Sequence, residues 1–360
     1  MLANATEESR VLNTIRAQTY DTDTVVSREI YTTFRLIFVG FLALVLAILG
    51  ISTNVVNCLV FQRQGLGDRM NLCLFCLALA DLGLLLFVFP FSMITIFCDL
   101  GLFGVTEEHY FKTSLYSLGI VYAFRTTSGC YNMVIAVERC VCVLFPLRAV
   151  SLIRTRTMGI ILASIAVTLQ VGFLTLPFRH QLVRLDMDGK VVWYLGLSAA
   201  WAANQKLFDI IFSHILSVIL PLVTFHVVSI ATLVTVVKLR VAMAWREKTS
   251  SAGTTNDSQM ALTKTLVLVS CVYIVTTLPL VGSKLVSVVS SDFSVLGRYL
   301  MLYNLITYVA NVFPLINSFV HFFVYYSRSS RFRRELTLLC LQLKTRRKIL
   351  SNRRNVGFKK

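Results

Sequence analysis

Seven long apolar stretches occupy most of this 360-residue chain, and each is close to the length of a membrane-crossing helix. Such a helix needs about 20 mostly apolar residues to cross the hydrocarbon core of a bilayer. None of the stretches alternates apolar and polar residues as a membrane-spanning strand would. The sequence therefore predicts an all-α membrane protein, a seven-transmembrane helix bundle, with spans at residues 36–61, 71–97, 114–137, 158–178, 210–237, 262–281 and 299–325.

The distribution of charge predicts how this bundle lies in the membrane. Only 15% of the residues are charged, and most of the Lys and Arg residues follow the first, third, fifth and seventh spans. Positive charge marks the cytoplasmic side, so we expect a multi-pass plasma-membrane protein whose N-terminus is extracellular and whose C-terminus is cytosolic. The expected regions are an extracellular tail at 1–35, the bundle at 36–325, and a cytosolic helix with a basic tail at 326–360.

A few ionisable side chains lie inside the expected spans, where each is costly. Asp81 lies in the middle of the second span, Arg125 in the third, and His321 late in the seventh. We favour a functional role for Asp81 and Arg125. A polar cluster that only fixes helix packing is the structural alternative, and a transporter or channel with Asp81, Arg125 and His321 as its charge pathway is the alternative function. Further polar groups expected near Asp81 are Asn54, Ser128 and Asn317.

Several short motifs occur in order along the chain, each at a characteristic position in its span. Asn54 lies in the first span, Asp81 ends Leu-Ala-Leu-Ala-Asp in the second, and Glu138-Arg139-Cys140 ends the third. Pro279 lies in the sixth span, and Tyr325 ends the seventh. This ordered set resembles the rhodopsin-like (class A) G-protein-coupled receptors over residues 36–332. The resemblance implies a short amphipathic eighth helix after the bundle.

The chain also departs from that family. His321 stands where the seventh helix has the asparagine of Asn-Pro-x-x-Tyr, and Thr277 stands where the sixth has tryptophan. Ser114 replaces the third-helix cysteine, so we expect no extracellular disulfide within the chain. These departures resemble a divergent invertebrate branch, similar to neuropeptide receptors or to mollusc chemosensory receptors.

The resemblance implies a cavity for an extracellular ligand, either a peptide or a small chemosensory molecule. We expect Arg125 at the depth of that cavity, where a guanidinium suits an anionic group. A salt bridge from Arg125 to a buried acid is the alternative. The expected lining also includes Val121, Phe124, Thr277 and His214.

The resemblance also implies a two-state switch that activates a heterotrimeric G protein. Glu138 would pair with Arg139 at rest, Pro279 would act as the hinge of the sixth helix, and Tyr325 would lie at the end of the seventh. Related receptors hold a sodium ion near the position of Asp81, and we expect a protonated His321 to take its place. No residue pattern indicates catalysis, a metal site or a cofactor, so we expect no enzyme.

The two tails and one loop carry weaker signals. Asn4 begins a glycosylation sequence, and Cys340 is a candidate palmitoylation site on a helix whose arginines suit anionic inner-leaflet lipids. Nucleic-acid binding is the rival interpretation of this basic tail, and the membrane context argues against it. Residues 182–185 and 191–194 flank an Asp-Gly pair, which predicts a β-hairpin. The apolar face of the C-terminal helix should consist of Phe332, Leu336, Leu339 and Leu343.

Overall fold

A computed structural model describes residues 26–145, 154–187, 190–204, 208, 210–249, 254–290, 292–293 and 298–357. Within this part of the chain, seven helices are long and apolar enough to cross a membrane, which confirms the seven-helix bundle. The helices are α2 (Arg28–Phe34), η1 (Arg35–Leu42) and α3 (Ala43–Gln64) in one run, α4 (Arg69–Asp99), α5 (Glu107–Leu144), α7 (Thr155–Phe173), η3 (Ile210–Ile219) continued by α10 (Leu220–Thr249), α11 (Thr254–Val289) and α12 (Leu300–Arg328).

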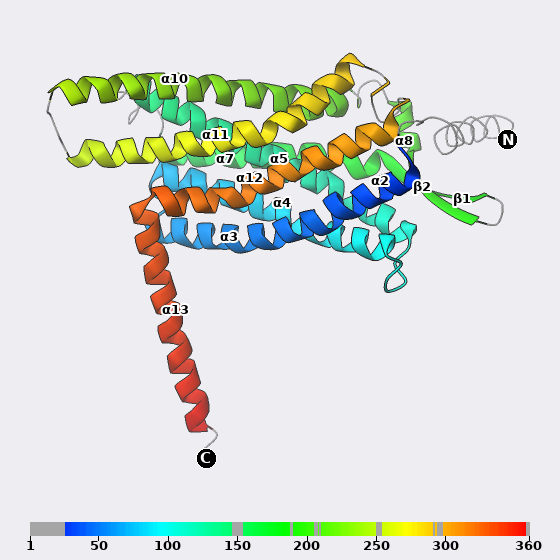
Figure 1. Ribbon diagram of the computed structural model, residues 1–360, viewed down its shortest axis with the longest axis horizontal. Coiled ribbons are helices and arrows are strands. Elements are labelled where there is room, and N and C mark those ends of the chain that lie inside the picture. The colour runs from blue at the N-terminus through cyan, green and yellow to red at the C-terminus, as the bar shows by residue number, and fades with distance from the viewer. Residues whose placement is uncertain are drawn as a thin grey trace.

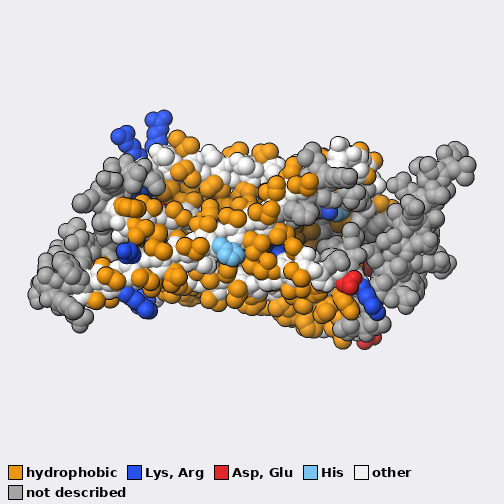
Figure 2. Space-filling view, turned by 90° about the horizontal axis from the view of Figure 1, so that it is seen from above, with side chains coloured by type: hydrophobic (Ala, Val, Ile, Leu, Met, Phe, Trp, Pro, Cys, Tyr) orange, Lys and Arg blue, Asp and Glu red, His pale blue; other side chains and the backbone are white. Residues whose placement is uncertain are grey.

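The helices run roughly side by side along the long axis (Figure 1). Most of them extend beyond the apolar windows of the sequence, and a polar side chain caps the start of α4. The Asp68 side chain, for example, accepts a hydrogen bond of 2.9 Å from the backbone N–H of Met70 and so starts α4 two residues before the expected span. On the face seen in Figure 2, hydrophobic side chains cover the middle of the bundle, as a lipid environment requires.

The two ends of the bundle differ in structure. At one end, the hairpin end, β1 (His180–Met187) pairs antiparallel with β2 (Lys190–Leu197), with Leu182 opposite Leu195. The opposite end holds Arg139 and is called the Arg139 end. From it, α13 (Ser330–Gly357) projects away from the bundle (Figure 1). The predicted hairpin is therefore confirmed, whereas the short C-terminal helix is in fact 28 residues long.

Hydrogen bonds, with no disulfide, close the base of the hairpin. The Ser198 N–H donates to the carbonyl of Arg179 at 2.9 Å, and its hydroxyl donates to the carbonyl of Phe178 at 2.6 Å. The nine cysteines, all of them in the described part of the chain, are unpaired. Burial and, second, the positive charge of Arg179 lower the pKa of His180 in β1 to about 4.

An ion pair joins the helices at the hairpin end. Arg35 of η1 donates two hydrogen bonds to the Asp99 carboxylate at the end of α4, one of them at 3.2 Å. The guanidinium of Arg35 also lies 4.9 Å from the ring centroid of Tyr110 on α5. These contacts join η1, α4 and α5 at the hairpin end.

A close approach of backbones fixes the packing of α5 on α7. A Cβ atom added at Gly119 would lie 2.7 Å from the carbonyl oxygen of Phe173, so only glycine fits there. Further along α5, the Tyr131 hydroxyl donates to the carbonyl of Leu162 at 2.9 Å. These contacts fix the position of α5 against α7. Helix α5 carries Arg125, Glu138 and Arg139, which are described below.

The junction of α12 and α13 is held by aromatic packing. Phe332 is only 1% exposed and lies against the rings of Phe61, Phe322 and Tyr325. The sequence placed Phe332 on the apolar face of an interfacial helix. In the structure its ring lies in the core of the bundle, next to the end of α12, and Leu336 packs against the same core. Phe332 anchors α13 to the bundle instead.

Candidate functional site

A cavity of about 130 Å³ lies between α5, η3, α10, α11 and α12, and α4 and α7 each add one residue to its wall. Such a volume is well below the ~300–1,000 Å³ usual for drug-sized ligands, so the cavity suits a small molecule. Aromatic and hydroxyl side chains make up much of its wall, with two cationic groups among them. The residues used below are Tyr122, Arg125, Gly129, Tyr273, Thr277, Lys284 and Asn317.

Arg125 lies in this cavity, as expected. Its Nη1 donates a hydrogen bond of 2.6 Å to Oδ1 of Asn311 on α12, and its guanidinium lies 4.6 Å from the centroid of the Tyr122 ring. The lining contains no Asp or Glu among the residues that the structure describes. The buried salt bridge weighed as an alternative is thus replaced by a neutral amide partner, which leaves the charge of Arg125 uncompensated.

Lys284 on α11 is the second cation of the cavity, and sequence reasoning missed it. Its Nζ donates a hydrogen bond of 3.2 Å to the Tyr303 hydroxyl on α12. The residue lies just beyond the expected sixth span, so it was counted with the adjoining loop. A signal was present, since Lys284 follows Thr277 by seven residues, which places both on one face of a helix.

Two of the expected lining residues lie elsewhere. Val121 and Phe124 pack against apolar residues of α3, α4 and α12, and the Phe124 ring stacks on Phe87 with centroids 6.2 Å apart. The reason is helical periodicity: Val121 and Phe124 share the α4 side of α5, whereas Tyr122 and Arg125 share the cavity side. Thr277 does line the cavity. The side chain of the remaining candidate, His214, lies outside the described residues.

The polar residues expected around Asp81 form only part of the predicted cluster. This central polar cluster was to consist of Asn54, Asp81, Ser128, Asn317 and His321. Ser128 donates a hydrogen bond of 2.6 Å to Oδ1 of Asp81, and Nδ1 of His321 lies 3.3 Å from Oδ2. His321 is thus close enough to Asp81 for an ion pair, but it makes no hydrogen bond to Oδ2, which has no hydrogen-bond partner among the described residues. Both side chains are almost fully buried. The two side chains therefore lie close together, but no hydrogen bond joins them.

The two asparagines of that cluster make other contacts. Asn54 donates hydrogen bonds of 2.9 Å to the carbonyls of Gly50 and Ser318 and so fastens α3 to α12. Asn317 lies on the wall of the cavity. Neither side chain touches Asp81 through a hydrogen bond that the structure describes.

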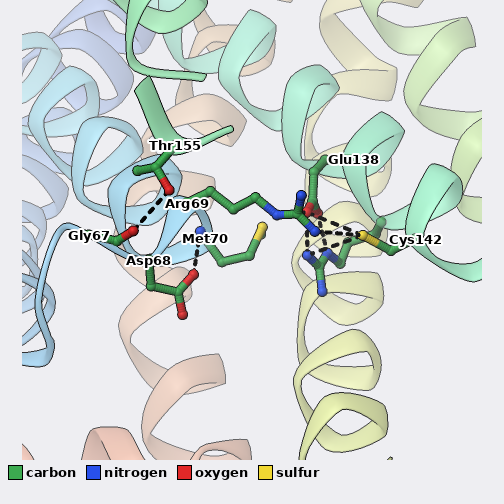
Figure 3. A network of polar contacts seen from close by, with 8 residues as sticks. Gly67, Asp68, Arg69, Met70, Glu138, Cys142 and Thr155 are labelled. Carbon is green, nitrogen blue, oxygen red and sulfur yellow. Dashed lines mark hydrogen bonds and ion pairs between the residues drawn. The ribbon is translucent and has the colours of Figure 1, made fainter. Parts of the chain in front are cut away.

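A charged network occupies the Arg139 end (Figure 3). Arg139 donates two hydrogen bonds to the Glu138 carboxylate, one of them at 2.6 Å, so the two residues of the motif are paired. Arg69 of α4, which sequence reasoning missed, places its Nε 3.0 Å from the same carboxylate. The Cys142 thiol lies 3.3 Å from Oε1. Glu138 therefore has two cationic partners, one on α4 and one on α5.

The family comparison agrees with this geometry. A family model described as Serpentine type 7TM GPCR chemoreceptor Srw matches residues 41–341, which include every helix of the cavity and the Arg139 network. The chain belongs to this chemoreceptor family. It is therefore a G-protein-coupled receptor and not an enzyme. A comparison with curated proteins found no match.

The remaining expected residues lie in α11, in α12 and in the two tails. Pro279 lies inside α11, between Thr277 and Lys284, and Tyr325 is buried against Phe61. Cys340 is exposed on α13. Asn4 lies outside the described residues.

Proposed function

We propose that this chemoreceptor is a divergent member of the rhodopsin-like class that binds a small extracellular molecule in the cavity and activates a heterotrimeric G protein. The observation that carries the proposal is the cavity itself, whose two cations, Arg125 and Lys284, face no described acid. An unpaired cation inside a membrane is costly, so an anionic ligand group would stabilise the occupied receptor. We place the hairpin end outside the cell and the Arg139 end in the cytosol, in agreement with the loop charges.

The switch would work through the Arg139 network. Arg139 leaves Glu138 and engages the G protein when α11, hinged at Pro279, moves outward. After this movement the Glu138 carboxylate would still have a cationic partner, because Nε of Arg69 lies 3.0 Å from it. A ligand drives the change only through its higher affinity for the active arrangement.

The tails support this placement in the membrane. Exposed Cys340 suits palmitoylation, and the basic side chains of α13 suit anionic inner-leaflet lipids. Asn4 is proposed to be glycosylated. We also keep the ligand class of the sequence analysis, a small chemosensory molecule or a peptide end. The cavity volume of about 130 Å³ favours the former.

Expression in cultured cells tests the proposal. A ligand screen read out by second messengers should find a compound that activates the wild type, and Arg139→Ala should abolish that response at normal surface expression. Arg334→Ala is the matched control, because this exposed arginine lies outside the network and the response should persist. Full output from Arg139→Ala would contradict the receptor mechanism. Substrate uptake or ionic current by the purified protein would favour the transporter or channel instead.

A further inference from the structure

The two cations of the cavity lie at different depths. Tyr273 on α11 and Gly129 on α5 serve as a common reference point along the bundle axis, since a Cβ atom at Gly129 would lie 3.0 Å from the Tyr273 hydroxyl. Arg125 is four residues from Gly129 toward the hairpin end, and Lys284 is eleven residues from Tyr273 in the same direction. At 1.5 Å per helical residue, Lys284 lies about 10 Å nearer the hairpin end than Arg125.

The hydrogen-bond partners on α12 give the same separation independently. Arg125 contacts Asn311, and Lys284 contacts Tyr303. These partners are eight residues apart on one helix, or about 12 Å along its axis. Both estimates refer to positions along the helix axes, and they place the two residues about 10–12 Å apart in depth. Each cation is held by a different partner on α12.

Both cations have donors to spare. A guanidinium carries five N–H donors and an ammonium three. The described residues engage one donor of Arg125, through Asn311, and one of Lys284, through Tyr303. Both partners are neutral, so neither positive charge is compensated within the cavity wall that the structure describes.

We propose that the ligand is a small linear molecule with an anionic group at each end, about 10 Å apart, bound by Arg125 at the deeper end and by Lys284 at the end nearer the hairpin. This inference rests on the proposed function for its biological meaning, but not for the binding event itself. The narrow volume of about 130 Å³ selects a slender chain between the two groups. Thr277, four residues from Tyr273 on α11, lies at about the depth of Arg125 and lines the cavity near the deeper anionic group.

Purified receptor in lipid nanodiscs tests this with simple probes. Isothermal titration with succinate, adipate and suberate should show affinity rising with chain length, because only the longer diacids reach both cations. Octanoate, which has the length of suberate and one charge, should bind on the order of tenfold more weakly. Equal affinity for suberate and octanoate, or binding of neither, would overturn the inference whatever the state of any variant.

Variants of Lys284 then test whether this residue binds the anionic group nearer the hairpin end. Lys284→Gln should remove the preference for suberate over octanoate, whereas Lys284→Arg should keep it. Lys264→Gln, at the opposite end of the same helix, is the matched control and should bind as the wild type does. If Lys284→Gln unfolds, Lys284→Arg and the wild-type diacid series still decide the outcome. Diacid binding without activation of a G protein would contradict the proposed function and leave this site standing; activation by other ligands without a diacid preference would do the reverse.

Discussion

Replacing His321 by asparagine tests the central pair most directly. Nδ1 of His321 lies 3.3 Å from Oδ2 of Asp81, and the two side chains are 2% and 0% exposed. If His321 is protonated, as the sequence analysis expects, the two unit charges attract by about 5 kcal/mol at that distance with an effective dielectric constant of about 20. Desolvation of both groups offsets most of this, but removal of one partner leaves a buried charge alone and costs about 3–5 kcal/mol. We therefore expect His321→Asn to lower the unfolding temperature by on the order of 10 °C in the absence of sodium.

Sodium should compensate for the lost imidazolium. The assay is thermal unfolding of purified receptor in sodium chloride and in choline chloride at equal ionic strength. The wild type should unfold at the same temperature in both salts, whereas His321→Asn should be several degrees more stable in sodium, because an ion that binds only the folded state stabilises it.

A double variant provides the control for this prediction. Asp81→Asn combined with His321→Asn removes both charges, so the dependence on sodium should disappear and much of the stability should return. A wild type that responds to sodium as strongly as His321→Asn would refute the argument that the imidazole replaces the ion. So would a single variant whose unfolding temperature is unchanged in choline.

Two other predictions follow from the cavity and the hairpin. Arg125→Gln should weaken an activating anionic ligand by about 2–5 kcal/mol, measured as a shift of its dose-response curve at matched expression, and unchanged potency would make Arg125 structural. Since the pKa of His180 is lowered to about 4, its protonated form is disfavoured in the folded hairpin. Hairpin stability should be complete above about pH 6.5 and fall as the pH drops toward about 4. Hydrogen exchange of the β1 and β2 amides, corrected for intrinsic rates, should therefore be faster at about pH 5 than at about pH 7 in the wild type but not in His180→Gln.

Much of the receptor could be predicted from its sequence because a membrane imposes local rules. Length and hydropathy determined the seven helices, since each must satisfy its own backbone hydrogen bonds in lipid. The Asp-Gly pair determined the hairpin for an equally local reason. The resemblance to a known receptor family implied a cavity at the depth of Arg125 and the pairing of Glu138 with Arg139.

Contacts between helices could not be predicted in this way. Whether a helical residue faces the cavity depends on the rotation of its helix, and for α5 that rotation is set by contacts such as Gly119 against α7. This is why Val121 and Phe124 were placed in the cavity and Lys284 was not. The partners Asn311 and Arg69 were missed for the same reason: each meets its target across a helix interface, far away in the sequence. The sequence by itself thus determined which segments cross the membrane and which charges they carry, because those properties belong to single helices. Only the tertiary structure decided which charges share a cavity, because that depends on how the helices pack against one another.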